Sequence, residues 1–377
     1  MKYIHEFQNN TEFENYYFGQ NYIKPHVSWT VDVDRLDYNK SGNEDYEYWK
    51  NQELTFQILT DGTVQWNADA LGSTAVINYR YNGSNWIGTS GSYKFWNVKA
   101  GDVLQFRAKK SSYANDTKHC YFACTCQFNL CGNIMSMIDN TKFVTVFSST
   151  KVFSNLFENC STLINAKNLV LPATTLTEYC YHQMFKGCTS LISAPTLPAT
   201  TLANNCYACM FQGCESLITV PELPATTLAN NCYQQMFDGC TSLTSTQELP
   251  ATTLANNCYA EMFQGCTGLT TAPALPATTL ANYCYHHMFK GCTSLTSAPE
   301  LPATTLVRSC YNGMFWDCTS LNYVKCLATN ISASNALTIW LSNVSSTGTF
   351  YKAAGVTYPS GASGIPSGWT VQDVANE

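Results

Sequence analysis

The chain has 377 residues, enough for two or three domains, and a formal net charge of −6. Charged residues make up only 12% of it, about half the usual share, so its surface must be rich in uncharged hydroxyl and amide groups. The negative charge argues against nucleic acid as a partner, and no apolar run is long enough to insert into a membrane.

Residues 1–50 are predicted to form an extended arm that attaches the protein to a partner. The segment is rich in Tyr, Asn, Asp and Glu and has too few aliphatic residues for a core of its own. Its start, from Met1 to Phe7, lacks the apolar stretch of a signal peptide. If Met1 is the natural start, we expect folding in a reducing cytosol, where the 19 cysteines would remain thiols.

Residues 51–138 are predicted to form a β-sandwich of immunoglobulin-like size. Short segments of alternating or β-branched and aromatic residues recur there, separated by turn signals such as Asn82-Gly83. The expected strands are 54–59, 76–81, 93–98, 103–107 and 126–130.

Four cysteines cluster near the end of this region, at Cys120, Cys124, Cys126 and Cys131. A metal site is one interpretation, but their spacing is not a standard zinc pattern. We favour the alternative that they are buried thiols alternating along strands.

The most regular feature is a repeat of 26 residues, which occurs six times between Leu171 and Cys326. The copies begin at Leu171, Leu197, Leu223, Leu249, Leu275 and Leu301, and a half copy precedes them from Leu156 to Leu163. A fixed period of this size is typical of solenoids, in which each copy buries its apolar face against its neighbours. We expect the solenoid to cover residues 139–326.

Each copy is predicted to contain one helix and one short strand. Apolar or small residues recur at positions 6, 10, 14 and 18 of a copy, with a second row at 11 and 15, which fits one broad face of a helix. In the third copy, Thr227 would cap the start of this helix and Gly239 would suit its exit. Strands of two to four residues, limited by prolines such as Pro221, would stack as a parallel sheet.

Twelve of the cysteines recur at positions 10 and 18 of the copies, on the face that we expect to be buried. They are Cys180, Cys206, Cys232, Cys258, Cys284 and Cys310, and then Cys188, Cys214, Cys240, Cys266, Cys292 and Cys318. A small apolar thiol packs well in such a place. A column of metal ligands is the alternative, but these two series carry no histidine or carboxylate in register and no C-x-x-C spacing.

The run from Met184 to Leu191 resembles the BspA-like leucine-rich repeats of surface proteins from gut and oral anaerobes. In that family a helix ends in an aromatic-x-x-Cys-x-x-Leu run and a short strand follows. The likeness covers residues 156–326 and implies a leucine-rich-repeat α/β solenoid. The longer period and the prolines depart from the family and indicate a less regular sheet.

Residues 327–377 are predicted to cover the open end of the solenoid as a C-terminal cap. A last helix is expected at 333–343, and strands are expected at 348–353 and 368–371. The predicted fold class is therefore α+β and multidomain: an arm, an immunoglobulin-like β-sandwich, a leucine-rich-repeat α/β solenoid and a cap.

The sequence predicts no enzyme and no catalytic, cofactor or metal site. The six histidines are not paired with a reactive thiol in the expected geometry, and the carboxylates of the repeats, such as Glu261, are scattered. An enzyme that uses the repeats only for targeting is a further alternative, but the sandwich lacks clustered histidines or carboxylates.

Positions 7–9, 12, 13 and 16 differ between copies, either because exposed positions drift or because they form a tuned binding face. Exposed Tyr, His and Gln suit a carbohydrate or a protein epitope, through stacking and hydrogen bonds. The candidate binding residues are Tyr179, His182, Gln183, Gln234, Gln235, Tyr283, His286 and His287.

The order of the segments suggests a function. An arm, a sandwich ending in Gly132 to Ser136, the repeats and a final Gly364 to Trp369 run look like proteins encoded by phages and prophages of gut Bacteroidetes-type bacteria. This resemblance implies a non-enzymatic fibre or adhesion protein of the virion, assembled in the host cytoplasm. Its N-terminal region would contact other virion proteins, its repeats would bind a host surface protein or glycan, and it could form a homo-oligomer. The alternative is a bacterial cell-surface adhesin whose leader is missing.

Overall fold

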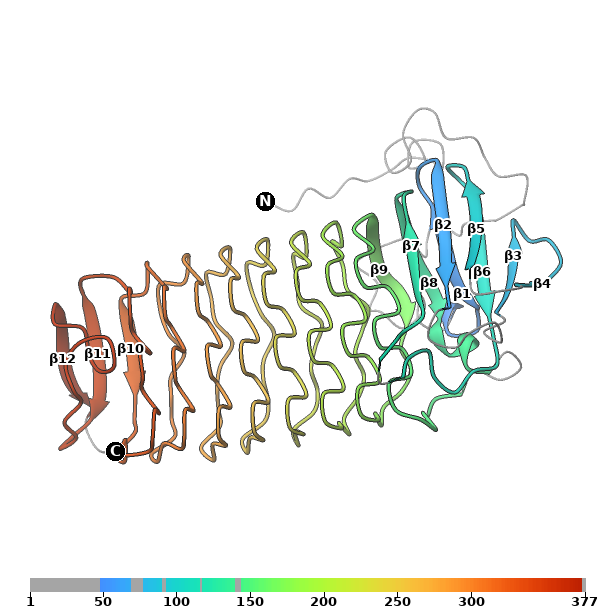
Figure 1. The fold of residues 1–377 in the computed structure, drawn as a ribbon. Coiled ribbons are helices and arrows are strands. Elements are labelled where there is room, and N and C mark those ends of the chain that lie inside the picture. The colour runs from blue at the N-terminus through green and yellow to red at the C-terminus, as the bar shows by residue number, and fades with distance from the viewer. Residues whose placement is uncertain (1–47, 69–76, 90–92, 116, 140–143, 375–377) are drawn as a thin grey trace.

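The computed structural model describes residues 48–68, 77–89, 93–115, 117–139 and 144–374. The molecule is elongated, with strands of a sandwich at one end, a long stack of coils, and a small sheet at the other end (Figure 1). The predicted arm, residues 1–50, lies almost wholly outside the described residues.

The N-terminal part consists of two facing sheets. One has the order β4-β3-β6-β1-β8-β9 and the other the order β5-β2-β7. The strands of this part are β1 Leu54–Ile58, β2 Gly62–Asn67, β3 Asn78–Tyr81, β4 Ile87–Gly88, β5 Tyr93–Val98, β6 Val103–Arg107, β7 Tyr121–Cys124 and β8 Phe128–Asn133. Of the five expected strands, 93–98 and 103–107 have the bounds of β5 and β6, and the other three overlap β1, β3 and β8. A short 3-10 helix, η3 at Ile134–Met137, follows β8.

Aromatic rings fill the space between the two sheets. Phe56 on β1 contacts Phe106 on β6 with ring centroids 5.1 Å apart, and it contacts Phe122 on β7 across the sandwich at 4.9 Å. Trp66 on β2 lies 4.8 Å from Phe122. All four side chains are fully buried, so alternation along the strands placed the large residues inward.

The sandwich is not a separate immunoglobulin-like unit. Strand β9, at Leu163–Val170, belongs to the first coil of the stack, yet it pairs in parallel with β8 of the sandwich. The sulfur of Cys160 also donates to the carbonyl of Phe122, 3.0 Å away. The two parts therefore share one sheet and one core.

The predicted α+β fold class, with a leucine-rich-repeat α/β solenoid that has a helix in each copy, is wrong. All of residues 171–326 are described, and their backbone forms no helix. Every fourth residue of the expected helix has a positive φ, as at Tyr179 (57°), Gln183 (54°) and Gly187 (72°) in the first copy. A left-handed residue in each turn interrupts the hydrogen bonds that an α-helix requires.

Instead, each copy winds through successive tight turns that bond alternately within the coil and to the next coil. In the first copy the N–H of Met184 donates to the carbonyl of Tyr181 at 3.2 Å, three residues back. The next N–H, of Phe185, donates to the carbonyl of Met210 in the following coil at 2.9 Å. This alternation satisfies the buried backbone and joins the coils into a stack, here called the column.

The predicted parallel sheet along the repeats is present only as isolated bridges between neighbouring coils. The extended halves of neighbouring coils meet only in isolated bridges, such as Thr175 with Thr201 and Thr227 with Thr253. Within the column, named strands occur only at its ends, in β9 and in β10 at Tyr323–Cys326. No continuous sheet closes around the described coils, consistent with the prolines, which cannot donate to a ladder.

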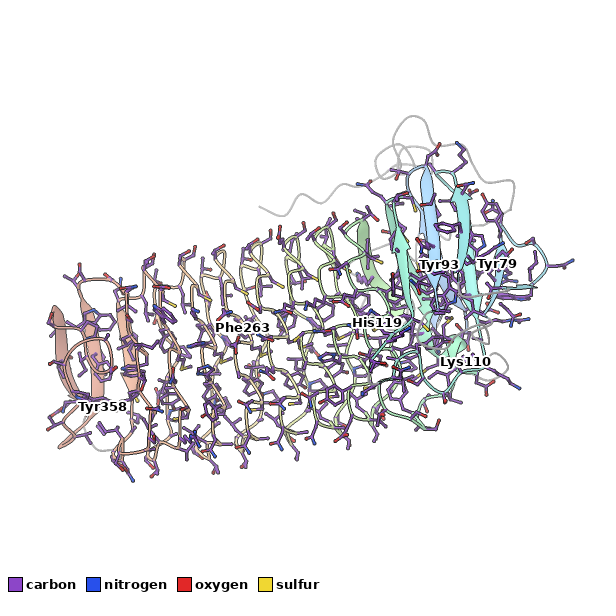
Figure 2. All side chains as sticks on the ribbon, viewed as in Figure 1. Tyr79, Tyr93, Lys110, His119, Phe263 and Tyr358 are labelled. Atoms are coloured by element: carbon purple, nitrogen blue, oxygen red, sulfur yellow. The ribbon has the colours of Figure 1, made fainter. Side chains whose placement is uncertain are left out.

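Aligned side chains fill the column from end to end (Figure 2, where Phe263 is labelled). Six tyrosines stack with ring centroids 5.6 to 6.0 Å apart, namely Tyr181, Tyr207, Tyr233, Tyr259, Tyr285 and Tyr311. A parallel series of phenylalanines runs from Phe157 to Phe315. The position-18 thiols each donate to the phenylalanine carbonyl of the preceding coil, as Cys240 does to Phe211 at 3.3 Å.

The C-terminal end carries a further coil and a parallel sheet of order β10-β11-β12. Strands β11 at Gly348–Ala353 and β12 at Trp369–Val374 lie where strands were predicted. The predicted helix at 333–343 is wrong, because this segment repeats the turns of the other copies, with positive φ at Asn335, Ile339 and Asn343. Trp340 continues the tyrosine stack, 6.3 Å from Tyr311, and Tyr358 follows it at 6.4 Å.

Candidate binding surface

The tight turns direct side chains inward and outward in pairs. Positions 10 and 11 are buried, 12 and 13 lie mostly at the surface, 14 and 15 are buried again, and 16 and 17 return to the surface. Because one left-handed residue falls in each group of four, two consecutive side chains share an outward corner.

All eight predicted binding residues are half-buried and lie at these corners or at the preceding one. The structure brings four of them together in two similar pairs. Tyr179 meets His182 edge to face with ring centroids 5.5 Å apart, and Tyr283 meets His286 in the same way at 5.9 Å. His287 lies against His286, with ring centroids 3.8 Å apart.

A cation lies over each of these tyrosines. The Lys151 ammonium is 5.6 Å from the Tyr179 ring centre, and the Arg308 guanidinium is 5.5 Å from that of Tyr283. Both cations come from a neighbouring coil, so each aromatic group is assembled from more than one coil. Such a surface combines a flat apolar face with hydrogen-bonding groups.

The predicted glutamines make polar contacts along the surface. Gln183 accepts a hydrogen bond from Asn155 at 2.7 Å, and Gln235 donates one to Glu261 at 2.8 Å and accepts one from the thiol of Cys209 at 3.3 Å. These bonds join side chains in successive coils. Gln234 lies beside Gln235, half-buried at position 12.

A second series of polar contacts runs along position 16. Asp238 accepts hydrogen bonds from Gln212 at 2.8 Å and from Gln264 at 3.4 Å, so it bridges three coils. At the end of this series the Lys290 ammonium lies 4.2 Å from the centre of the Trp316 ring. The outward surface is thus a bonded array with little net charge.

Burial keeps the histidines of this surface neutral. Desolvation, with the charges of Lys186 and Lys151, lowers the pKa of His182 to about 4. Desolvation, with His286 and Lys290, lowers the pKa of His287 to about 4. The pKa of His286 is also lowered, mainly by burial. Neutral imidazoles can both donate and accept hydrogen bonds, or ligate a metal ion.

Burial also governs the thiols. It raises the pKa values of the interior series, for example to about 12 at Cys206 and Cys318. Each of the 19 cysteines is a free thiol, and a protonated interior thiol is a poor nucleophile. Of the four cysteines near the end of the sandwich, Cys120, Cys126 and Cys131 are buried and Cys124 is half-buried.

One group among the described residues has the geometry to hold a metal ion. It consists of Glu261, His286 and His287, whose ligand atoms lie within 4.8 Å of one another. Sequence reasoning treated Glu261 as an isolated carboxylate. Its relation to His287 was nevertheless visible, because the two residues are 26 positions apart and so occupy the same place in consecutive copies.

Comparison of the chain with protein-family models, with curated proteins and with solved structures found no match. Among the described residues, none of the helical segments combines the length and the apolar character that a membrane span requires.

Proposed function

We propose that the protein is a non-enzymatic structural and adhesion protein of a phage virion, which displays the outward corners of its column to a host surface protein or glycan. The observation that carries the proposal is that six coils repeat one backbone and one interior while their outward side chains differ. The interior of each coil is nearly identical, with Tyr, Met, Phe and Cys at fixed positions. Such a scaffold holds a variable surface rigidly, as repeat proteins that bind extended partners do.

The chemistry of the outward corners favours an uncharged polar ligand. Two Tyr–His groups, at Tyr179 and Tyr283, offer aromatic rings against which a sugar ring or a planar side chain can pack beside Lys151 and Arg308. Glutamine and neutral histidine side chains lie between and beside them, and they can donate or accept hydrogen bonds. Only 12% of the chain is charged, which agrees with recognition through stacking and hydrogen bonds.

The junction between the sandwich and the column supports a role in attachment. Because β8 and β9 are paired and aromatic rings stack without a break from Phe122 to Phe157 and onward to Phe185, a load on the column passes directly into the sandwich. A fibre that is fixed at one end and binds a surface along its length needs such a stiff connection.

Mass spectrometry of phage particles purified from the bacterium that carries the gene tests this function. We expect the protein at a stoichiometry of several copies per particle, and cryo-EM should show the column projecting from the particle. Absence from purified particles would overturn the proposal.

A binding assay tests the surface itself. The full chain should bind host cells or a glycan array, and a Tyr179→Ala/Tyr283→Ala double variant should bind at least tenfold more weakly. The matched control is Thr226→Ala/Thr252→Ala, which removes two exposed hydroxyl groups elsewhere on the coils. Equal loss in both variants would show that the outward corners are not the binding surface.

A further inference from the structure

We propose that Glu261, His286 and His287 form a binding site for a single first-row divalent cation of the zinc type, at the boundary between the fourth and fifth copies. The three residues supply one carboxylate oxygen and two imidazole nitrogens, all within 4.8 Å of one another. This site does not depend on the proposed function, and it was not expected from the sequence.

The stacking of the coils brings the three ligands together. Glu261 and His287 occupy position 13 in consecutive copies, so the column places one directly beside the other. The N–H of Glu261 donates to the carbonyl of His286 at 2.7 Å, which fixes the two coils in register at this point. His287 has a φ of 53°, and the left-handed turn directs it to the same outward corner as His286.

The imidazole of His286 has a free ligand atom. Its Nδ1 is buried and has no hydrogen-bond partner among the described residues, which is costly for a polar atom unless a ligand satisfies it.

The surroundings hold the ligands in place. Gln235 donates to the Oε2 atom of Glu261 at 2.8 Å, which orients the carboxylate as outer hydrogen bonds do in metal sites. Glycine at position 313 leaves room for His287, because a Cβ there would lie 2.5 Å from its Nε2 atom. The Lys290 ammonium lies over the Trp316 ring, 4.2 Å from its centre.

The ligand set indicates the class of metal. Two nitrogens and one oxygen suit zinc, cobalt or nickel, whereas calcium and magnesium prefer oxygen ligands alone. Donor atoms that share a zinc ion at about 2.1 Å stand roughly 3.4 Å apart. The two imidazoles are stacked with ring centroids 3.8 Å apart, so binding requires their rings to rotate until both nitrogens face the ion. Three protein ligands leave at least one position for water or for a group of a bound partner.

Isothermal titration of the metal-free full chain with zinc chloride tests the proposal. We expect one site per chain, and at least tenfold weaker binding in His286→Gln, His287→Gln and Glu261→Gln. The matched control is His182→Gln, which removes the histidine at the same place in the first copy, where Gln183 stands in place of a second histidine. It should bind zinc as the unchanged chain does.

Two further readings make the result decisive. Circular dichroism checks that each variant folds. If a histidine variant does not fold, the zinc affinity of Glu261→Gln is the deciding measurement, because this substitution preserves the size of the side chain. Cobalt in place of zinc should give visible d–d bands without a thiolate charge-transfer band. The proposal is overturned if the chain does not bind zinc, if the three variants bind zinc unchanged, or if the cobalt spectrum indicates thiolate ligands.

Discussion

The tyrosine stack contains hydroxyl groups that should destabilise the fold. Tyr207 is 1% exposed, and its hydroxyl oxygen is buried with no hydrogen-bond partner among the described residues. Burial raises its pKa well above the ordinary value, so the group remains a protonated and unsatisfied phenol. Replacing it with phenylalanine keeps the stacking on Tyr181 and Tyr233, at 5.6 and 5.9 Å, and removes only the hydroxyl.

The expected effect of Tyr207→Phe is a gain in stability. Relief of an unsatisfied buried polar group contributes about 2 kcal/mol. The small void left by one oxygen, roughly 10 Å³, costs about 0.2 kcal/mol. The free energy of unfolding should therefore rise by about 1.5 to 2 kcal/mol, which for a chain of this length corresponds to an increase in melting temperature of roughly 2 to 3 °C.

Tyr113 provides the matched control, because it is also fully buried but its hydroxyl donates to the carbonyl of Met137 at 2.5 Å. Tyr113→Phe should lower the free energy of unfolding by about 1 to 2 kcal/mol, since it leaves that carbonyl without this bond. Urea unfolding of both variants measures the two effects. If Tyr207→Phe destabilises the protein as much as Tyr113→Phe, the Tyr207 hydroxyl is satisfied and the reasoning is refuted.

Three other outcomes can be measured. Position-18 thiols such as Cys240 should react with a thiol reagent only after denaturation, because they are buried and donate to backbone carbonyls; rapid labelling of native protein would contradict this packing. Deletion of the copy at 223–248 should leave a folded, shorter column, whereas truncation after Cys266 should cause aggregation because it exposes an apolar coil. Light scattering and thermal melting compare the two variants, and an equal loss of folded protein would mean that the copies are not equivalent. The pKa of His182 is lowered from 6.5 to about 4, chiefly by burial, so the unfolded chain binds more protons between these values and stability should fall as pH drops from about 6.5 to 4. His182→Gln should remove about 2 kcal/mol of this loss after allowance for solvent screening. Urea unfolding at several pH values measures it; a difference in free energy of unfolding between the two proteins that is the same at every pH would show that His182 does not titrate in this way.

The missing helices show where the sequence pattern was ambiguous. A helix buries residues at intervals of about 3.6 positions, and the turns of this column bury pairs of residues at intervals of four positions. Over the length of one copy, the sequence pattern is compatible with either structure. The pattern nevertheless repeats at intervals of four without drift, from Cys232 through Met236 to Cys240. On a helix these three residues would rotate steadily away from one face. Asn231 and Gly239, both of positive φ, mark the left-handed positions, but Gly239 was interpreted as a helix exit.

The sandwich strands were easier to predict, because over five or six residues an alternation of apolar and polar side chains fits a β-strand and no other regular structure. Residues 93–98 and 103–107 were assigned from their pattern, and β5 and β6 have these bounds. Their arrangement into sheets was not predictable in the same way. The pairing of β8 with β9 depends on a contact between the sandwich and the first coil, which no local pattern records.

Only part of the candidate surface could be predicted from the sequence. Sequence variation identified the corners that hold Tyr179, Tyr283 and the histidines, although these side chains are half-buried in the structure. Glu261 is not recognisable as a candidate ligand from its neighbours along the chain, because the histidines beside it belong to the next copy. In a column whose coils are in register, the relevant neighbour of a residue lies 26 positions away, so aligning the copies is the correct way to search for sites.

The hydrogen-bond pattern explains why this column can carry different sites along its length. Alternate N–H groups in the turns of one coil donate to carbonyls of the next, and these bonds involve only the backbone. Side chains at the outward corners can therefore change without loss of a bond that holds the stack together. The interior cannot change in this way, because its aromatic rings stack on their equivalents in adjacent coils and its position-18 thiols donate to carbonyls of the preceding coil. The glutamine contacts of the middle copies and the His–His–Glu group at the next boundary are, on this view, alternative uses of one repeated corner.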